Sequence, residues 1–331
     1  MSAENPTPSG ESDLRTALTA QKKKRRTAAI AVGAVAVVGL VAGTVAIVAN
    51  LGSTEPTANA AEASSAPDDL SVTIATAEDS VFQDTIAEVA AEKGLEVDWL
   101  NVDDWVLPNT ELVAGTVDAN AFQHILYLSA FNTENDADIT PVFSTVITQW
   151  GIFSATLDDI DALADGARIG IPDDPSNGGR ALNILESAGL IELTADAGDF
   201  PTVDDIETNE RNLQFVPLPA RDIPLQFEDP SLSAVIVGTS YFDPSQGIGA
   251  DDALFLDDSL DEKNLPYVNV VATRADDVDN PAWKILKEAY ADPRVADALE
   301  EEYFGNTVLV DVDIEDLRAK LADLEAAAAQ G

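Results

Sequence analysis

From Leu70 onward, short runs of β-branched and apolar residues alternate with longer segments whose apolar positions recur at helical spacing. This alternation begins with a predicted strand over Ser71–Ala75, a helix over Phe82–Gly94 and a strand over Leu95–Leu100. It predicts an α/β sheet with right-handed crossovers. The further extended segments expected are Pro141–Ser154, Ala167–Pro172, Leu213–Val216, Ser233–Val237 and Tyr267–Thr273. The further helices expected are Thr110–Ala114, Ala121–Phe131, Gly179–Ser187, Ala282–Tyr290, Arg294–Tyr303 and Ile314–Ala327.

The first 69 residues have a different pattern. Residues 1–26 hold six basic and three acidic residues, and the uncharged segment Thr27–Ala49 follows directly. A helix of that length extends about 34 Å, enough to cross a hydrocarbon core of about 30 Å. The basic cluster Lys22–Arg26 predicts that residues 1–26 form a cytoplasmic tail and that the chain after Ala49 lies outside.

A cleaved secretory signal is the alternative for the same segment. Ala58-Asn59-Ala60 offers small residues at the spacing of a cleavage site, but a signal usually has an apolar stretch of about 7–15 residues. The length of Thr27–Ala49 therefore favours a transmembrane anchor. Residues 50–69, which are rich in Ala, Ser, Thr, Pro and acidic residues, predict a flexible linker. Both alternatives place the folded part, Leu70 to Gly331, on the outer side of the cell membrane.

Composition excludes several functional classes. The chain has 60 acidic and 18 basic residues, a net charge of −42, which argues against the basic face that nucleic-acid binding requires. Its 46% of hydrophobic residues suffices for a core, so the acidic runs are expected on a solvated surface. The chain contains no cysteine and one histidine, which excludes disulfides, thiolate chemistry and a cluster of imidazole ligands. We expect no cofactor and no metal site.

The segment Ile171–Leu182 carries the first recognisable chemistry. A predicted strand ends at Pro172, a turn rich in Asp, Pro, Ser and Asn follows, and a helix is expected to begin near Gly178. Free backbone amides at a helix N-terminus favour an anion, and Arg180 in the first turn could hold a carboxylate by two hydrogen bonds. Taken alone, the pattern is also typical of an ordinary helix start.

A second cluster surrounds the single histidine. His124 and Tyr127 are three residues apart and would share one face of the helix expected over Ala121–Phe131. A general-base role for His124 needs a nucleophile that the sequence does not place, so a structural role is favoured. An extracellular hydrolase is disfavoured for the same reason, and because the chain has no Gly-x-Ser-x-Gly elbow.

From about Ser71 to its end, the chain resembles the NlpA-type substrate-binding proteins, whose best-known members are the methionine-binding lipoproteins of methionine ABC importers. The resemblance runs in order and spacing over about 260 residues. The blocks that carry it are Asp104–Asn109, Asp118–His124 with Tyr127-Leu128, Ile171–Leu182, Asn212-Leu213, Ala234–Ile236, and Pro266–Asn269 before Thr273-Arg274.

This resemblance implies a fold and a function. The fold is the type II periplasmic-binding-protein fold, two α/β lobes with a hinge and an interlobe cleft, here preceded by an N-terminal transmembrane helix. The first lobe would be residues 70–147 plus 274–331, and the second residues 148–273. The function is that of an extracytoplasmic substrate-binding protein of an ABC importer, not an enzyme. It would capture a free amino acid, methionine before others, and deliver it to a permease and its ATPase by closing around the ligand.

The resemblance also implies a ligand-binding site. Arg180 would pair with the ligand carboxylate, Asn177 would help to fix it, and Asn269 would accept a hydrogen bond from the ligand ammonium. The remaining site residues, which would wall the side-chain pocket, are Trp105, Phe122, His124 and Tyr127. For Trp105, which stands where the family usually has Tyr, an ordinary core position is the alternative.

The chain departs from the family pattern in three places. It lacks the cysteine that would carry a lipid anchor, for which Thr27–Ala49 would substitute. Val237 stands where the family usually has a ligand-contacting Asn, and Thr76–Ser80 lacks the family's typical residues. These departures leave open a different amino acid or a small peptide as the ligand, or a non-transport acidic surface protein.

Overall fold

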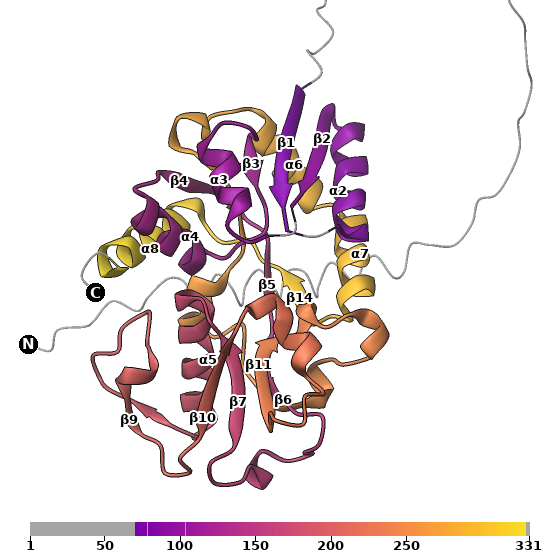
Figure 1. Cartoon of the computed structure of the whole chain (residues 1–331). Coiled ribbons are helices and arrows are strands. Elements are labelled where there is room, and N and C mark those ends of the chain that lie inside the picture. Colours follow the sequence, from indigo (N-terminus) through magenta and orange to yellow (C-terminus); the bar gives the residue numbers. More distant parts are fainter. Residues whose placement is uncertain (1–69, 78, 103, 329–331) are drawn as a thin grey trace, which may run out of the picture.

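The computed structural model describes residues 70–77, 79–102 and 104–328. These residues form two α/β lobes, each built around a five-stranded sheet, which lie one above the other in Figure 1. The mixed α/β architecture expected from the sequence is confirmed. The tail, anchor and linker expected over residues 1–26, 27–49 and 50–69 fall outside the described residues. Within the described ranges, no helix combines the length and apolar character that a membrane span requires.

The first sheet has the strand order β2-β1-β3-β13-β4. Strand β1 pairs in parallel with β2 and β3, whereas β13 runs antiparallel to both β3 and β4. Its strands are β1 (Leu70–Thr76), β2 (Leu95–Asn101), β3 (Ala119–Asn120), β4 (Ile139–Ser144) and β13 (Val270–Arg274). The parallel part follows from the strand–helix–strand alternation of the sequence, because a parallel pair requires a crossover between its strands.

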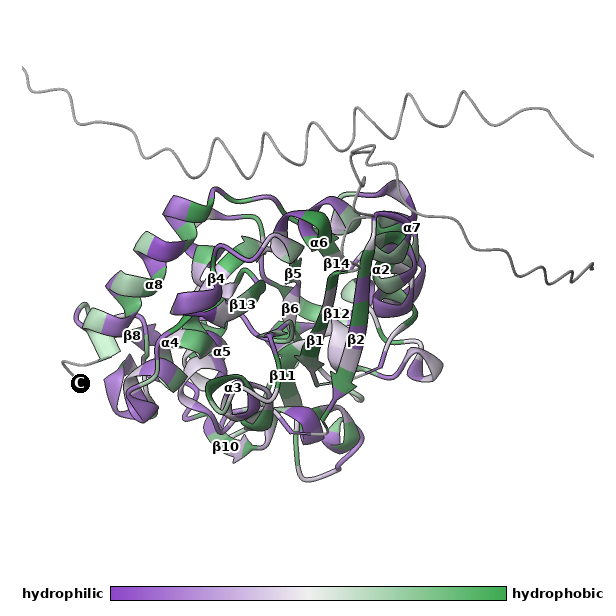
Figure 2. Ribbon diagram, turned by 90° about the horizontal axis from the view of Figure 1, so that it is seen from above, coloured by the Kyte–Doolittle hydropathy of each residue, from purple (hydrophilic) through white to green (hydrophobic). Residues whose placement is uncertain are grey.

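Helices cover the two faces of the first sheet. One core joins β1 to α2, α6 and α7, with Ile74 and Ile86 fully buried in it. The other core joins β13 to α4 and α8, with Val270 and Leu317 fully buried. The helices are α2 (Val81–Glu92), α3 (Leu107–Val113), α4 (Ile125–Asn135), α6 (Ala282–Tyr290), α7 (Pro293–Tyr303) and α8 (Ile314–Ala328). Figure 2 shows apolar colouring on β1, while polar and apolar segments alternate along α8, as expected for a helix with one buried face.

The second sheet repeats this plan with the order β10-β7-β11-β6-β12. Its strands are β6 (Trp150–Phe153), β7 (Arg168–Pro172), β10 (Gln214–Leu218), β11 (Ala234–Gly238) and β12 (Ala253–Leu256). Helix α5 (Pro175–Ser187) packs on one face, where Ile236 of β11 is buried, and Val235 and Val237 are buried on the other. This division follows the period-two alternation of a strand that is covered on both faces.

The described chain also contains a short hairpin and several 3₁₀ helices, most of them in the second lobe. A hairpin joins β8 (Glu192–Leu193) to β9 (Ile206–Thr208). The 3₁₀ helices of the described chain are Ile160–Ala162, Val203–Asp205, Ala220–Gln226, Thr239–Tyr241, Pro244–Gln246, Ala250–Asp252, Glu262–Tyr267 and Ala275–Asp277. The sequence pattern predicted neither these turns nor the hairpin, because each is too short to show a period.

A narrow ribbon connects the lobes. Strand β5 (Val146–Thr148) pairs antiparallel with β14 (Thr307–Leu309), and both lie between the two sheets in Figure 1. On the other side of β5, Asn269 donates its backbone N–H to Val146 O and accepts from Thr145 N, both at 2.8 Å. The segment containing Asn269 leads directly into β13.

The position of β13 differs from the lobe boundary expected at Thr273. Its residues belong to the first sheet, because they form a backbone ladder with Ile139–Ser144. The chain therefore leaves the second sheet before Val270. The strand expected over Tyr267–Thr273 is correspondingly shorter, since Tyr267 still belongs to the 3₁₀ helix Glu262–Tyr267.

Candidate ligand-binding site

A cavity of about 270 Å³ lies between the two lobes. It is lined by side chains of both lobes and of the connecting ribbon. All seven residues expected at the site line it: Trp105, Phe122, His124, Tyr127, Asn177, Arg180 and Asn269. Its volume is just below the roughly 300–1,000 Å³ of sites for drug-sized molecules, which suits a ligand the size of an amino acid.

Arg180 is a buried cation at the wall of this cavity. Its side chain is 2% exposed, and its guanidinium lies between two aromatic rings, 4.6 Å from the centroid of Trp150 and 4.2 Å from that of Tyr267. Its Nη2 donates to Thr148 O at 3.1 Å, while its Nε has no hydrogen-bond partner. Burial lowers the pKa of Arg180 to about 10, so the group remains charged at neutral pH. A buried cation with an unused N–H is a ready partner for a carboxylate.

The start of helix α5 places Arg180 and Asn177 together. The helix begins at Pro175 and not near Gly178, because Asp174 caps it by accepting from Asn177 N at 2.9 Å and proline suits its first turn. Asn177 and Arg180 are therefore three residues apart within the helix and share one face. A Cβ at Gly178 would lie 2.9 Å from Pro172 O, so only glycine fits this close approach of the helix to the preceding strand.

His124 caps helix α4 instead of lying within it. Its Nδ1 accepts from Tyr127 N at 3.0 Å, and the helix expected from Ala121 begins only at Ile125. The residues before it are extended, because Ile125 N donates to Val268 O and Val270 N donates to Gln123 O. His124 and Tyr127 thus meet through a cap and an edge-to-face ring contact of 6.2 Å between centroids. The expectation that these two residues share one face of a helix is therefore wrong, because His124 precedes the first turn of α4.

The tautomer of His124 follows from these contacts. Since Nδ1 accepts a backbone N–H, the proton of the neutral ring is on Nε2, which donates to Asn177 Oδ1 at 3.0 Å. The amide of Asn177 in turn donates to both carboxylate oxygens of Asp174, at 3.1 and 3.0 Å. Burial lowers the pKa of His124 to about 4, so the ring is neutral at pH 7.

Half-buried aromatic side chains form the wall nearer the solvent. Trp105 stands edge-to-face with Tyr127 at 6.5 Å and tilts toward Tyr241 at 5.3 Å, and Phe122 meets Tyr127 at 6.0 Å. Asp104 fixes the backbone beside Trp105 by accepting from Val106 N and Leu107 N. Because it lines the cavity, Trp105 is not an ordinary core aromatic. Apolar and aromatic walls of this kind accept an aliphatic or thioether side chain.

Three buried carboxamides adjoin this wall, and one of them, Gln123, also lines the cavity. Asn120 Nδ2 and Gln123 Nε2 both donate to Asn109 Oδ1, at 2.8 and 2.6 Å, and Asn109 Nδ2 donates to Gln123 Oε1 at 2.8 Å. Gln123 Nε2 also donates to Asn120 Oδ1 at 3.0 Å. The cluster ties α3, which follows Trp105, to the segment that presents Phe122 and His124.

Asn269 lies where the connecting ribbon meets the cavity. Its backbone bridges to Val146 and Thr145, and it forms an isolated antiparallel bridge with His124. Its half-buried side chain makes no hydrogen bond with another described residue, which leaves its amide oxygen as an acceptor at the cavity.

Sequence reasoning missed Trp150, Tyr241 and Tyr267. The sequence did contain one signal for Trp150, namely Gly238 at the end of β11. A Cβ at Gly238 would lie 2.7 Å from Trp150 Nε1, so the glycine makes room for the ring that covers Arg180. Tyr267 lay within a block of the family resemblance, but its place over Arg180 depends on the fold.

The structure does not place Val237 at the cavity, although this position was expected to contact the ligand. Val237 is fully buried in the second lobe, in the core that contains Phe153 and Phe242. It is not among the described residues that line the cavity. The expectation that this position alters a ligand contact is therefore wrong, because strand alternation turns its side chain into the core.

Sequence comparison with known proteins identifies the family. The NlpA lipoprotein family matches residues 70–310. A curated relative, the D-methionine-binding lipoprotein MetQ of Escherichia coli (strain K12), is 32% identical over 243 residues, 73% of this chain and 88% of the relative.

Solved structures agree as well. Protein PG110 from Staphylococcus aureus has a TM-score of 0.70 at 30% identity and covers 76% of this chain and 99% of its own. A nutrient-binding protein from Burkholderia cenocepacia bound to methionine has a TM-score of 0.65 at 32% identity and covers 72% and 99%. The family expected from the sequence blocks is confirmed: the chain belongs to the NlpA lipoprotein family.

Proposed function

We propose that this protein is the substrate-binding protein of an ABC importer, which captures methionine between its lobes and delivers it to a permease and its ATPase. Relatives whose names include D-methionine binding, and a related structure bound to methionine, support the choice of amino acid. The related proteins are binding proteins, and the role proposed here needs no chemical step.

The observation that carries the proposal is the environment of Arg180. A guanidinium that is 2% exposed, stacked between Trp150 and Tyr267 and left with an unpartnered Nε, is costly unless an anion completes it. A ligand carboxylate supplies that anion and gains charge-assisted hydrogen bonds in a dry cleft. The neutral His124 adds no competing charge beside it.

The other site residues divide the rest of the ligand between them. Asn177 helps to hold the carboxylate from the same face of α5, and Asn269 accepts from the ammonium through its free amide oxygen. The apolar side chain of the ligand lies against Trp105, Phe122, His124 and Tyr127. This division places the charged end of the ligand in the buried half of the cavity and its side chain against rings, where a thioether makes favourable contacts.

We further propose that Thr27–Ala49 anchors the protein in the cell membrane, with Lys22–Arg26 on the cytoplasmic side and the binding lobes outside. The support is the uncharged length of this segment, the basic cluster before it and the absence of any cysteine for lipid attachment in the whole chain. Residues 50–69 would then link the anchor to β1. Protease protection in spheroplasts checks this topology, since external protease would digest the lobes but spare residues 1–26.

Isothermal calorimetry of the purified full chain in mild detergent tests the proposed ligand. The panel is L-methionine, D-methionine, other amino acids and small peptides. We expect methionine to bind with a Kd of about 1 µM or lower, about −8 kcal/mol. Binding of a different amino acid or peptide would retain the role but reject methionine, and binding of none would favour a non-transport surface protein.

A further inference from the structure

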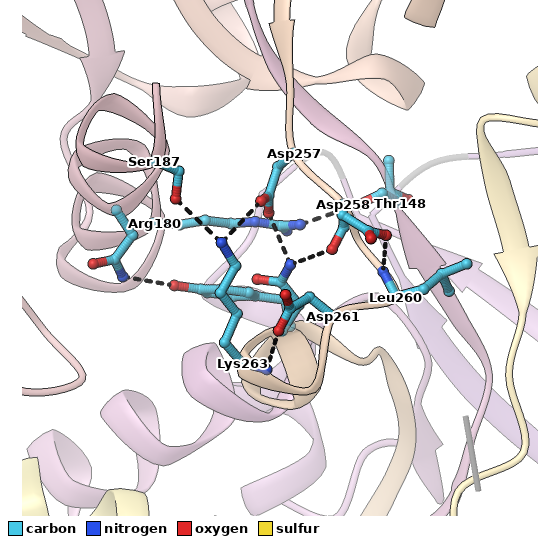
Figure 3. Close-up of polar contacts among 11 residues, drawn as sticks. Thr148, Arg180, Ser187, Asp257, Asp258, Leu260, Asp261 and Lys263 are labelled. Atoms are coloured by element: carbon cyan, nitrogen blue, oxygen red, sulfur yellow. Dashed lines mark hydrogen bonds and ion pairs between the residues drawn. The ribbon is translucent and has the colours of Figure 1, made fainter. Parts of the chain in front are cut away.

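A buried carboxylate that does not line the cavity lies near Arg180. Asp257 follows β12, is 5% exposed, and is not among the described residues that line the cavity. Its backbone N–H donates to Trp150 O at 2.8 Å. Asp257 therefore lies beside Trp150, whose ring covers Arg180. Figure 3 shows its carboxyl group next to the guanidinium of Arg180.

Two neighbours hold Asp257 in place. Asn264 Nδ2 donates to Asp257 Oδ2 at 2.9 Å and to Asp258 O at 2.7 Å, so the carboxylate is fixed within its own loop. Lys263 Nζ lies 3.5 Å from Asp257 Oδ1. The negative charge of Asp257 thus lies close to two positive charges, those of Arg180 and Lys263, and Figure 3 shows the three side chains together.

The loop that carries Asp257 and Lys263 is tied to helix α5. Lys263 Nζ donates to Ser187 Oγ at 3.1 Å, and Asn183 Nδ2 donates to Tyr267 OH at 3.3 Å. Since Arg180 belongs to the same helix, these contacts keep Asp257 and Lys263 at a fixed position relative to the guanidinium. The lysine side chain is 51% exposed, so it can be replaced without opening the core.

Arg180 is not ion-paired with any described residue, so Asp257 acts on it through space and leaves its Nε–H without a partner. Burial is the largest influence on the pKa of Arg180 and lowers it, and the negative charge of Asp257 opposes that change. Asp257 therefore stabilises the buried cation when the cleft is empty. A ligand carboxylate at Arg180 is repelled by the same charge, because like charges interact strongly where water is excluded.

We propose that Asp257 and Lys263 form a charge pair beside Arg180, outside the cavity lining, that sets the affinity for a carboxylate ligand. Asp257 weakens binding by competing for the positive charge of Arg180, and Lys263 strengthens binding by offsetting Asp257. This inference rests on the proposed function, since it assumes that a carboxylate binds at Arg180. It identifies two affinity-determining residues that do not touch the ligand.

Two substitutions with opposite expected effects test the pair. In calorimetry of the full chain with L-methionine, we expect Asp257→Asn to bind about 3- to 10-fold more tightly and Lys263→Met about 3- to 10-fold more weakly. Lys287→Met is the matched control, because Lys287 is 50% exposed, pairs with Asp311 at 2.8 Å and does not line the cavity. Its Kd should equal that of the wild type.

The sign of the Asp257→Asn effect separates tuning from damage. In both cases the melting temperature of the ligand-free protein should fall. A purely structural defect would weaken methionine binding, whereas loss of the competing charge should strengthen it. Equal or weaker binding by Asp257→Asn, or tighter binding by Lys263→Met, overturns the charge pair. Failure of the wild type to bind methionine overturns the proposed ligand instead. In that case the same variants are compared by their thermal shift in sodium acetate, a plain carboxylate, with the same order of affinities expected.

Discussion

His124 and Asn177 are joined by a hydrogen bond of 3.0 Å that crosses from the first lobe to the second. One residue caps α4 and the other lies in the first turn of α5, and both are at least nine-tenths buried. The bond uses the Nε2 proton of a neutral ring, because Nδ1 accepts from Tyr127 N. Protonation of this ring, the only histidine in the chain, would therefore occur at Nδ1 and disrupt the cap of α4, while the bond to Asn177 could persist.

The burial of His124 predicts a loss of stability in acid. The pKa of His124 is lowered from 6.5 to about 4, so between these values the unfolded chain binds a proton that the folded protein does not. The contribution is full above pH 6.5 and is lost as the pH falls through about 4, by about 3 kcal/mol in all. Urea unfolding of the wild type and of His124→Gln at pH 7.5 and 4.5 measures it. An equal loss in both proteins would contradict the prediction.

Substitution of Arg180 should abolish the charge partner of the ligand. We expect Arg180→Met to weaken methionine binding by about 3 kcal/mol or more, because one partner of a buried pair is removed. Calorimetry measures the change. Arg211→Met is the control, since Arg211 contacts Ile160 O and Leu163 O and does not line the cavity. Near-normal affinity of Arg180→Met would reject the carboxylate site.

Gly238→Ala should disturb the stack on Arg180. The new Cβ would lie 2.7 Å from Trp150 Nε1, so the indole must move, at a cost of about 1–3 kcal/mol in stability. Ligand affinity should fall with it, because Trp150 covers the guanidinium. Chemical denaturation and calorimetry test both effects. Gly249→Ala, whose Cβ would lie 3.4 Å from the nearest atom, Asn306 Nδ2, should change neither.

Removal of Asn109 should damage the site without touching the ligand. In Asn109→Leu, the buried amides of Asn120 and Gln123 lose partners, at about 1–3 kcal/mol for each unsatisfied group. Affinity should also fall, since these amides hold the segment that ends at His124. Asn135→Ala, which removes a single bond to Phe131 O within α4, is the control and should cost less than about 1.5 kcal/mol. A variant as stable as the wild type would contradict the role of the cluster.

Elements with a clear period could be predicted closely from the sequence. Helix α6 begins at Ala282 and ends at Tyr290 as expected, because its apolar face follows the helical repeat. The predicted start of a helix was wrong where a single capping side chain determines it. The start of α5 depends on Asp174 as a cap, and that of α4 on His124, whose imidazole is an unusual capping group that the common signals do not include.

The sequence by itself determined the family, the alternation of strands and helices and the identity of Arg180 as the candidate anion partner. These depend on local order, which the chain carries in its spacing. Only the tertiary structure decided that Trp150 and Tyr267 enclose Arg180, that Asp257 lies near it and that Val237 faces the core. Each of these facts depends on contacts between residues far apart in the chain, and such contacts are fixed by the packing of the lobes and not by any local pattern.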